Sequence, residues 1–240
     1  MRLAAILAFG LSIAVPANAG SGDTSISSIL FVGNSLTYGN DLPSIVCRLA
    51  AVGGHTVRCD SVAQPNFSLA DHWEEGAAAR RIRRMKPSVV VMQQGPSGSV
   101  EGRAMLLTDG ARWSERIRKS GGRPAFFMVW PAGSRFSDFE RVNESYRMAS
   151  RETGGVLLPA GSAWLEAWRR DRTLKLYGPD GFHPSVAGSY LAALTIYRGL
   201  FGAIPPSFAD ENIATAAAGG DLGLTAAQLR TLIEAAEAAK

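Results

Sequence analysis

The residues best suited to chemistry in this chain are one early serine and one late histidine with a neighbouring acid. Ser35 lies just beyond an apolar run, after Gly33 and Asn34, at the carboxyl end of an expected strand, where open parallel sheets hold their ligands. Asp180 and His183 lie three positions apart in residues 178–185, GPDGFHPS. A serine nucleophile needs a base, and that base needs an acid to orient it. These residue types predict acyl transfer by a Ser-His-Asp triad.

Local sequence holds His183 at the end of a rigid loop. Pro184 suits the first position of a helix and pushes His183 into an extended conformation. Gly181 permits a tight turn, so that Asp180 reaches back to one imidazole nitrogen. The other nitrogen of His183 is then free to face a serine.

Each of these residues has an ordinary structural explanation as well. A serine in a strand-to-helix turn is often a helix cap, and Asp-Gly is often only a turn. The other two histidines fit a base less well. His55 opens the second expected strand at its amino end, and His72 lies near a helix start with no acid placed to orient it.

Short apolar runs alternate along the chain with segments of helical periodicity. The runs predict strands over Ile29–Val32, Thr56–Val62, Val89–Met92, Ala125–Trp130 and Val156–Leu158. The periodic segments predict helices over Leu42–Val52, Trp73–Met85, Ala104–Lys119, a stripe from Phe139 to Ala149, the segment from Val186 to Phe201, and Ala226–Ala239. Such alternation indicates a parallel sheet covered on both faces. We therefore expect an α/β fold, a three-layer α/β/α sandwich with a parallel five-stranded sheet.

Composition and charge favour a globular protein and give no support for nucleic-acid binding. The chain has 240 residues, 46% of them hydrophobic, and a formal net charge of +4. A basic cluster at residues 80–86 ends a predicted helix whose first turn is acidic, an arrangement that complements the helix dipole. No aromatic residues interleave with these charges, so we expect no nucleic-acid partner.

The first residues have the three parts of a secretory signal peptide. Arg2 precedes an apolar run over residues 3–15, and residues 17–19 read Ala-Asn-Ala, a small-x-small cleavage pattern. The run is shorter than the ~20 residues that a membrane span needs. We therefore expect residues 1–19 to be a signal peptide and residues 20–240 to form one domain. The mature protein is expected to be secreted or periplasmic, with no stable membrane anchor.

Export changes the interpretation of the two cysteines. Cys47 and Cys59 are expected on the first long helix and on the next strand, which pack as neighbours. In an oxidising compartment such a pair can form a disulfide. Two buried thiols that act as small hydrophobic side chains are the alternative. The sequence leaves both open and assigns neither cysteine a catalytic role.

The chain resembles the SGNH/GDSL-type hydrolases, roughly from Ile29 to Leu200. The segment Gly33-Asn34-Ser35 matches the first block of that family, with Asn34 where the motif usually carries Asp. Residues 180–183 match the family's last block, Asp-x-x-His. The resemblance implies Ser35 as nucleophile, His183 as general base and then acid, and Asp180 as the residue that holds the imidazole.

The middle blocks of the family, which supply its oxyanion hole, are altered in this chain. Besides the Ser35 N–H, the family uses a Gly N–H after the second strand. This chain has no Gly there, and Asn66 is the candidate donor, through its backbone N–H or its side-chain amide. The family also uses an Asn side chain after the third strand. Here Gln93-Gln94-Gly95 is similar to the Gln-Gly-Glu-Ser pattern of SGNH carbohydrate acetylesterases, which makes Gln94 the candidate. Two strand-end amides that satisfy loop backbone are the alternative.

The sequence thus predicts an exported serine esterase that acts on a carboxylic ester, with acetyl or short acyl groups on a carbohydrate as the favoured substrate. A lipase or thioesterase of the same family is one alternative. A non-catalytic glycan-binding or polysaccharide-assembly protein that retains the fold is another. The histidines and cysteines form no metal-ligand pattern and no phosphate-cradling glycine loop occurs, so we expect no cofactor. The expected partner is a small-molecule or glycan ester.

Overall fold

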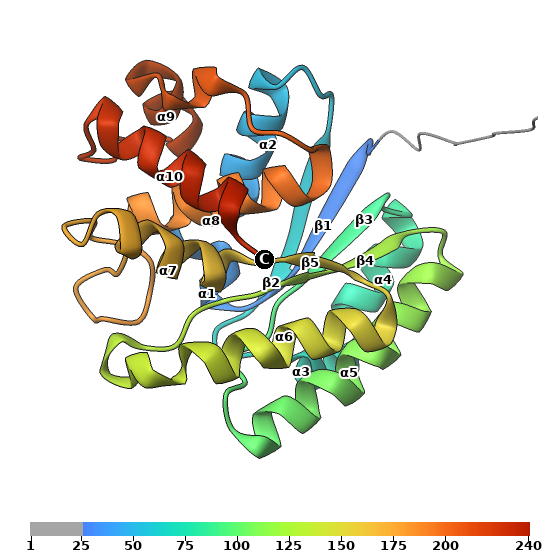
Figure 1. Cartoon of the computed structure of the whole chain (residues 1–240). Helices are drawn as coiled ribbons and strands as arrows, with labels where there is room; N and C mark the ends of the chain where they lie inside the picture. The colour runs from blue at the N-terminus through green and yellow to red at the C-terminus, as the bar shows by residue number, and fades with distance from the viewer. Residues whose placement is uncertain (1–25) are drawn as a thin grey trace, which may run out of the picture.

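A five-stranded parallel sheet forms the centre of the computed structural model, which describes residues 26–240 (Figure 1). The strands are β1 (Ser28–Gly33), β2 (Arg58–Ala63), β3 (Val89–Met92), β4 (Arg123–Phe127) and β5 (Val156–Leu158). Their order across the sheet is β2-β1-β3-β4-β5. The order reverses between β1 and β3, and the carboxyl ends at such a point are the usual ligand site of this sheet topology.

Helices cover both faces of the sheet and form the two outer layers (Figure 1). One layer holds α3 (Leu69–Glu75), α4 (Ala77–Met85), α5 (Val100–Lys119) and α6 (Phe139–Thr153). The other holds α2 (Leu42–Val52), α7 (Ala160–Arg170), α8 (Val186–Phe201), α9 (Glu211–Ala218) and α10 (Ala226–Ala238). Short elements lie in the connections, namely α1 (Ser35–Tyr38), η1 (Gly39–Asp41), η2 (Gly133–Asp138) and η3 (Pro206–Ala209). The predicted three-layer α/β/α sandwich is confirmed.

Burial of the strands follows from this layering. All residues of β1 and β3 are buried, because helices cover both faces of the inner strands. β2 lies at an edge, and its residues Arg58–Ala63 are only partly buried or exposed. The predicted strand Thr56–Val62 therefore begins two residues before β2. An edge strand with few apolar residues has no clear apolar run whose first residue indicates where the strand begins.

Two predicted elements differ from the structure for local reasons. The expected helix Trp73–Met85 is two helices, because Gly76 has a φ of 82° and breaks the helix between α3 and α4. The expected strand Ala125–Trp130 spans Arg123–Phe127 instead, because its neighbour β5 is short and ends opposite Phe127. The structure also contains α7 and α9, which the periodicity did not predict, and α5 begins at Val100 and not at Ala104.

Pro184 is not the first residue of α8, contrary to the sequence expectation. It forms an isolated antiparallel bridge with Tyr177, and Ser185 caps the helix by accepting a hydrogen bond from the Gly188 N–H at 3.0 Å. His183 lies outside the helix, as the sequence predicts. The bridge between Tyr177 and Pro184 holds it there, and not a proline at the first position of α8.

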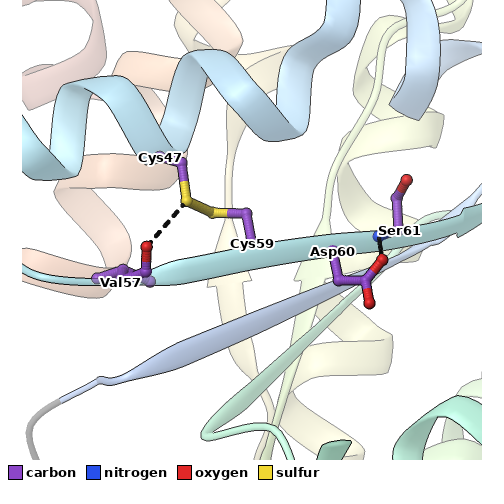
Figure 2. Close-up of a disulfide and its surroundings, with 5 residues drawn as sticks. All are labelled: Cys47, Val57, Cys59, Asp60 and Ser61. Atoms are coloured by element: carbon purple, nitrogen blue, oxygen red, sulfur yellow. Dashed lines mark hydrogen bonds between the residues drawn. A yellow bond between two sulfur atoms is a disulfide. The ribbon is translucent and has the colours of Figure 1, made fainter.

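A disulfide joins Cys47 of α2 to Cys59 of β2, with 6.0 Å between their Cα atoms (Figure 2). Of the two possibilities that the sequence left open, the structure has the bridge. It ties the edge strand to the helix layer above it. The carbonyl oxygen of Val57 lies 3.3 Å from the sulfur of Cys47 (Figure 2).

The expected signal peptide, residues 1–19, lies outside the described residues. Among the helices of residues 26–240, none combines the length and apolar character that crossing a bilayer requires.

Candidate active site

Ser35 is the first residue of α1, directly beyond the carboxyl end of β1. The side chain of Asn34 caps this short helix by accepting a hydrogen bond from the Leu36 N–H at 3.1 Å. The Asn34 amide also donates to the Phe67 carbonyl at 3.0 Å, in the loop after β2. Asn34, which replaces the usual Asp of the family motif, thus both caps α1 and connects it to the neighbouring loop.

Gln93, directly after β3, holds the segment of residues 33–37 around Ser35, which we call the serine turn. Its side-chain oxygen accepts hydrogen bonds from the Asn34 N–H at 2.9 Å and from the Thr37 hydroxyl at 2.8 Å. A Cβ atom on Gly33 would lie 2.5 Å from that oxygen and 2.3 Å from the Thr37 hydroxyl. Gly33 is therefore required for Gln93 and Thr37 to approach the backbone closely.

His72 supports the same turn from α3. Its side chain is fully buried, and its Nε2–H donates to the Gly33 carbonyl at 2.8 Å. Burial lowers the pKa of His72, although the hydrogen bond to Gly33 acts in the opposite direction. His72 is therefore neutral, and it holds the serine turn in place through the Gly33 carbonyl.

The loop that carries His183 is fixed by several hydrogen bonds. Asp180 Oδ1 accepts from the N–H groups of Phe182 and His183, both at 3.0 Å, in a turn that Gly181 completes with a φ of 67°. The indole N–H of Trp130 donates to the Phe182 carbonyl at 3.1 Å. Asp180 therefore reaches back toward the histidine, as the sequence predicts, and the loop is anchored to the end of the β4 segment.

His183 bridges Ser35 and Asp180 through its two ring nitrogens. Nδ1–H donates to Asp180 Oδ2 at 2.5 Å, and Nε2 accepts from the Ser35 hydroxyl at 2.9 Å. A carboxylate only accepts hydrogen bonds, which assigns the ring proton to Nδ1. The hydrogen bond from His183, with further ones from backbone N–H groups, lowers the pKa of Asp180 to about 2. The carboxylate thus stays charged, and Nε2 is left basic toward the serine hydroxyl.

Ser35 and Asn66, two of the candidate oxyanion donors, both line a cavity beside the Ser35 side chain. Within the described residues, neither N–H has a hydrogen-bond partner. Asn66 is exposed and has a φ of 62°, a left-handed conformation that glycine adopts freely and asparagine tolerates. Asn66 therefore adopts a backbone conformation typical of glycine, at the place where the SGNH/GDSL-type hydrolases carry Gly.

Gln94 lies at the same cavity, but its amide has other partners in this structure. Its Nε2 donates to the Ser97 hydroxyl at 3.1 Å and to the Gly102 carbonyl at 3.4 Å. The buried Tyr146 hydroxyl donates to the Gln94 carbonyl at 2.6 Å, and burial raises the pKa of Tyr146, which keeps that hydroxyl protonated. A role for the Gln94 side chain at an oxyanion requires the amide to leave these partners, and it stays a prediction.

A cavity of about 410 Å³ borders Ser35, within the range of about 300–1,000 Å³ typical of small-molecule sites. Its lining comes from the serine turn, the loops after β2 and β3, the start of α5, the η2–α6 segment and Phe182. Apolar parts of the wall come from Phe67, Met105, Val142 and Phe182. The serine hydroxyl thus meets a space large enough for a monosaccharide-sized ligand.

Solved structures with the same fold were found, whereas no family model and no curated protein matches the chain. A protein from Slackia heliotrinireducens assigned to the SGNH hydrolases is 26% identical, covers 73% of this chain and 99% of its own, and has a TM-score of 0.62. A lipase/acylhydrolase from Enterococcus faecalis is 18% identical over 75% of this chain and 98% of its own, with a TM-score of 0.60. A catalytic mutant of an acetylxylan esterase from Geobacillus stearothermophilus is 17% identical over 73% of this chain and 94% of its own, with a TM-score of 0.55.

The chain has the fold of the SGNH-type hydrolases. The resemblance to SGNH-type hydrolases, predicted from the first and last blocks, is confirmed by these neighbours.

Two ionisable residues of the cavity were not predicted from the sequence. Arg135 of η2 and Asp138, the last residue of η2, line the wall of the same cavity as Ser35. They lie in a segment without a recognised motif. The only signal in the sequence is their spacing of three positions, which allows an ion pair within one helical turn. Within residues 26–240, no cluster of three His, Cys, Asp or Glu side chains could share a metal ion.

Proposed function

We propose that this SGNH-type hydrolase is an exported serine esterase with Ser35 as nucleophile, His183 as base and Asp180 as the orienting acid. The observation that carries the proposal is the pair of contacts at His183, 2.9 Å to the Ser35 hydroxyl and 2.5 Å to Asp180. Nucleophile, base and orienter in this chain of hydrogen bonds form the triad that acyl transfer by a serine uses.

In the first half of the reaction, Ser35 Oγ attacks the carbonyl carbon of the ester, and His183 Nε2 takes the hydroxyl proton. The imidazolium that forms is stabilised by the charged Asp180 at Nδ1. Collapse of the tetrahedral intermediate breaks the bond to the alcohol, which leaves with the proton from Nε2. The acyl group is then an ester of Ser35.

In the second half, a water molecule attacks the acyl-enzyme while His183 Nε2 again accepts a proton. The bond from the acyl carbon to Ser35 Oγ breaks, and Nε2 returns the proton to the serine. The carboxylic acid leaves, and the enzyme is restored.

The negative oxygen of both intermediates needs donors, and we assign the N–H groups of Ser35 and Asn66. Neither has another partner within the described residues, and both border the cavity. The left-handed backbone of Asn66, with its φ of 62°, supports the backbone N–H over the side chain as donor. Loss of one such donor typically costs about 2.7–4 kcal/mol of transition-state stabilisation.

The favoured substrate is an acetyl or other short acyl ester of a carbohydrate. Support comes from the similarity of Gln93-Gln94-Gly95 to the block of SGNH carbohydrate acetylesterases and from the acetylxylan esterase among the structural neighbours. The cavity of about 410 Å³ suits a sugar ring better than a long acyl chain. Export is supported by the leader pattern of residues 1–19 and by the Cys47–Cys59 disulfide, since such bridges persist in oxidising compartments.

The test combines active-site labelling with turnover. The purified protein is treated with a fluorophosphonate probe, and hydrolysis of p-nitrophenyl acetate is measured for the wild type and Ser35→Ala. We expect labelling of the wild type only, and a loss of kcat of at least about 10⁴-fold in the variant.

Ser61→Ala serves as the matched control, because Ser61 is an exposed serine of β2 that does not border the cavity. It is expected to label and turn over as the wild type does. A folded wild type that neither labels nor turns over would favour the non-catalytic carbohydrate-binding alternative. Turnover that survives in Ser35→Ala would refute the assigned nucleophile.

A further inference from the structure

The cavity beside Ser35 contains one cation and one anion in its lining, Arg135 and Asp138. The other lining residues are neutral, mainly serines, glycines, amides and apolar side chains. Any charge preference of the cavity is therefore decided by how these two side chains are partnered.

The carboxylate of Asp138 is fully occupied by arginines. Its side chain is 7% exposed, and Oδ2 accepts from Arg135 Nε at 2.8 Å and from Arg135 Nη2 at 2.7 Å. The other oxygen, Oδ1, accepts from Arg141. These hydrogen bonds, that from Arg141 above all, hold the pKa of Asp138 below its ordinary value. Two arginines thus surround one carboxylate, and this group of three side chains is net positive, although Arg141 itself does not line the cavity.

Arg135 keeps free donors for a ligand. A guanidinium has five N–H groups, and Arg135 uses those on one edge, Nε and Nη2, to hold Asp138. The other edge, formed by Nη1 and Nη2, has no further hydrogen-bond partner among residues 26–240. The side chain is 67% exposed. An arginine with one edge clamped by a buried carboxylate and the other free is preorganised to bind a compact oxyanion with two hydrogen bonds.

We infer that Arg135 is a specificity-determining residue, and that the ester substrate carries a carboxylate or a phosphate close to the scissile ester. The inference rests on the proposed esterase function, in which the acyl group is short and uncharged. The anion therefore belongs to the alcohol part, which for a carbohydrate means an acidic sugar or a sugar phosphate. Arg135 and Ser35 line one cavity, so a single ligand can bind the guanidinium and present its ester to the serine.

The first experiment compares matched substrates. Values of kcat/KM are measured for a mono-O-acetylated methyl glucuronoside, for its neutral methyl ester and for the corresponding O-acetylated glucoside 6-phosphate. We expect at least one anionic substrate to exceed the neutral ester by about 10- to 150-fold, the range that hydrogen bonds to charged groups produce. Whichever anionic substrate has the larger value identifies the anion as a carboxylate or a phosphate. Equal values for all three substrates would overturn the inference.

The second experiment asks whether Arg135 causes the preference. In Arg135→Gln the ratio of kcat/KM for the anionic substrate to kcat/KM for the neutral ester should fall to near one. Arg135→Lys should retain part of this preference, since lysine keeps the charge but cannot form the bidentate pair of hydrogen bonds. Arg151→Gln is the control, because Arg151 lies on α6, pairs with Glu144 and does not line the cavity. A ratio that is unchanged in Arg135→Gln would overturn the assignment.

Failure of this inference is distinguishable from failure of the esterase proposal. Hydrolysis of p-nitrophenyl acetate that depends on Ser35 tests the esterase alone, since that substrate has no carboxylate or phosphate. An enzyme that passes this test and shows no preference for an anionic ester refutes only the role of Arg135. Circular dichroism of Arg135→Gln checks its folding, and a folded variant with a lost preference supports the inference.

Discussion

Replacement of Gln93 by leucine should weaken both the fold and the reaction. Gln93 is fully buried, and its side-chain oxygen accepts from the Asn34 N–H at 2.9 Å and from the Thr37 hydroxyl at 2.8 Å. Leucine has a similar size and accepts no hydrogen bond. The backbone immediately before Ser35 would then have a buried N–H without an acceptor.

The magnitude follows from the groups that lose their partner. A buried unsatisfied donor costs about 1–3 kcal/mol, which applies to the Asn34 N–H, and the lost bond of the Thr37 hydroxyl contributes about 1 kcal/mol. The Gln94 carbonyl, which also loses the Gln93 amide, keeps the Tyr146 hydroxyl at 2.6 Å. We therefore expect a loss of about 2–4 kcal/mol in the free energy of unfolding.

The reaction should slow as well, because Asn34 directly precedes the nucleophile. A misplacement of about 1 Å can cost on the order of 100-fold in rate, so kcat of Gln93→Leu is expected to fall by about 10- to 100-fold. Urea unfolding followed by circular dichroism gives the free energy of unfolding. Turnover of p-nitrophenyl acetate by the folded variant, without denaturant, gives kcat.

Gln64→Leu is the matched control, since it makes the same chemical change at an exposed glutamine after β2. It is expected to change stability by no more than about 0.5 kcal/mol. If Gln93→Leu unfolded and reacted like Gln64→Leu, the role of Gln93 in holding the serine turn would be refuted.

Three further predictions concern Asp180, the disulfide and Asn66. The pKa of Asp180 is lowered to about 2 from 3.8, so its charged form stabilises the fold above pH ~4 and loses this effect as the pH falls toward 2. The difference in unfolding free energy between wild type and Asp180→Asn should accordingly shrink from pH 4 to pH 2, and a constant difference would contradict this. Reduction of the Cys47–Cys59 bridge, or its replacement by two serines, should lower the unfolding free energy by about 2–3 kcal/mol in urea titrations, and an unchanged midpoint would contradict it. Asn66→Gly should retain kcat within a few-fold if the backbone N–H is the oxyanion donor, while a loss near 100-fold would assign the role to the side chain.

The alternation of apolar runs and helical segments was enough to predict the layered fold. β3 has the predicted bounds, because a strand covered on both faces must be apolar throughout, and the edge strand β5 has them as well, since it is a short apolar run. Where this constraint is relaxed, as at the edge strand β2, the bounds shifted. The break at Gly76 was missed, since a glycine within a helical pattern shows its φ only in the structure.

Part of the site is local and therefore readable from the chain. Asp180 reaches His183 through a four-residue turn, and both of its backbone bonds lie within that turn. The Asn34 side chain likewise caps α1 through the Leu36 N–H, only two positions away. For interactions this short in sequence, residue type and spacing carry most of the geometry.

The sequence by itself determined the layered α/β class, the orienting of an imidazole by Asp180, and a serine at the end of a buried strand. Only the tertiary structure decided that this serine meets His183, 148 positions later, at a distance of 2.9 Å. It also decided that Gln93, and not Gln94, contacts the serine turn, and that Arg135 shares a cavity with Ser35. The physical reason is that hydrogen bonds between distant segments depend on how the sheet and its helices pack, and packing is a property of the whole chain.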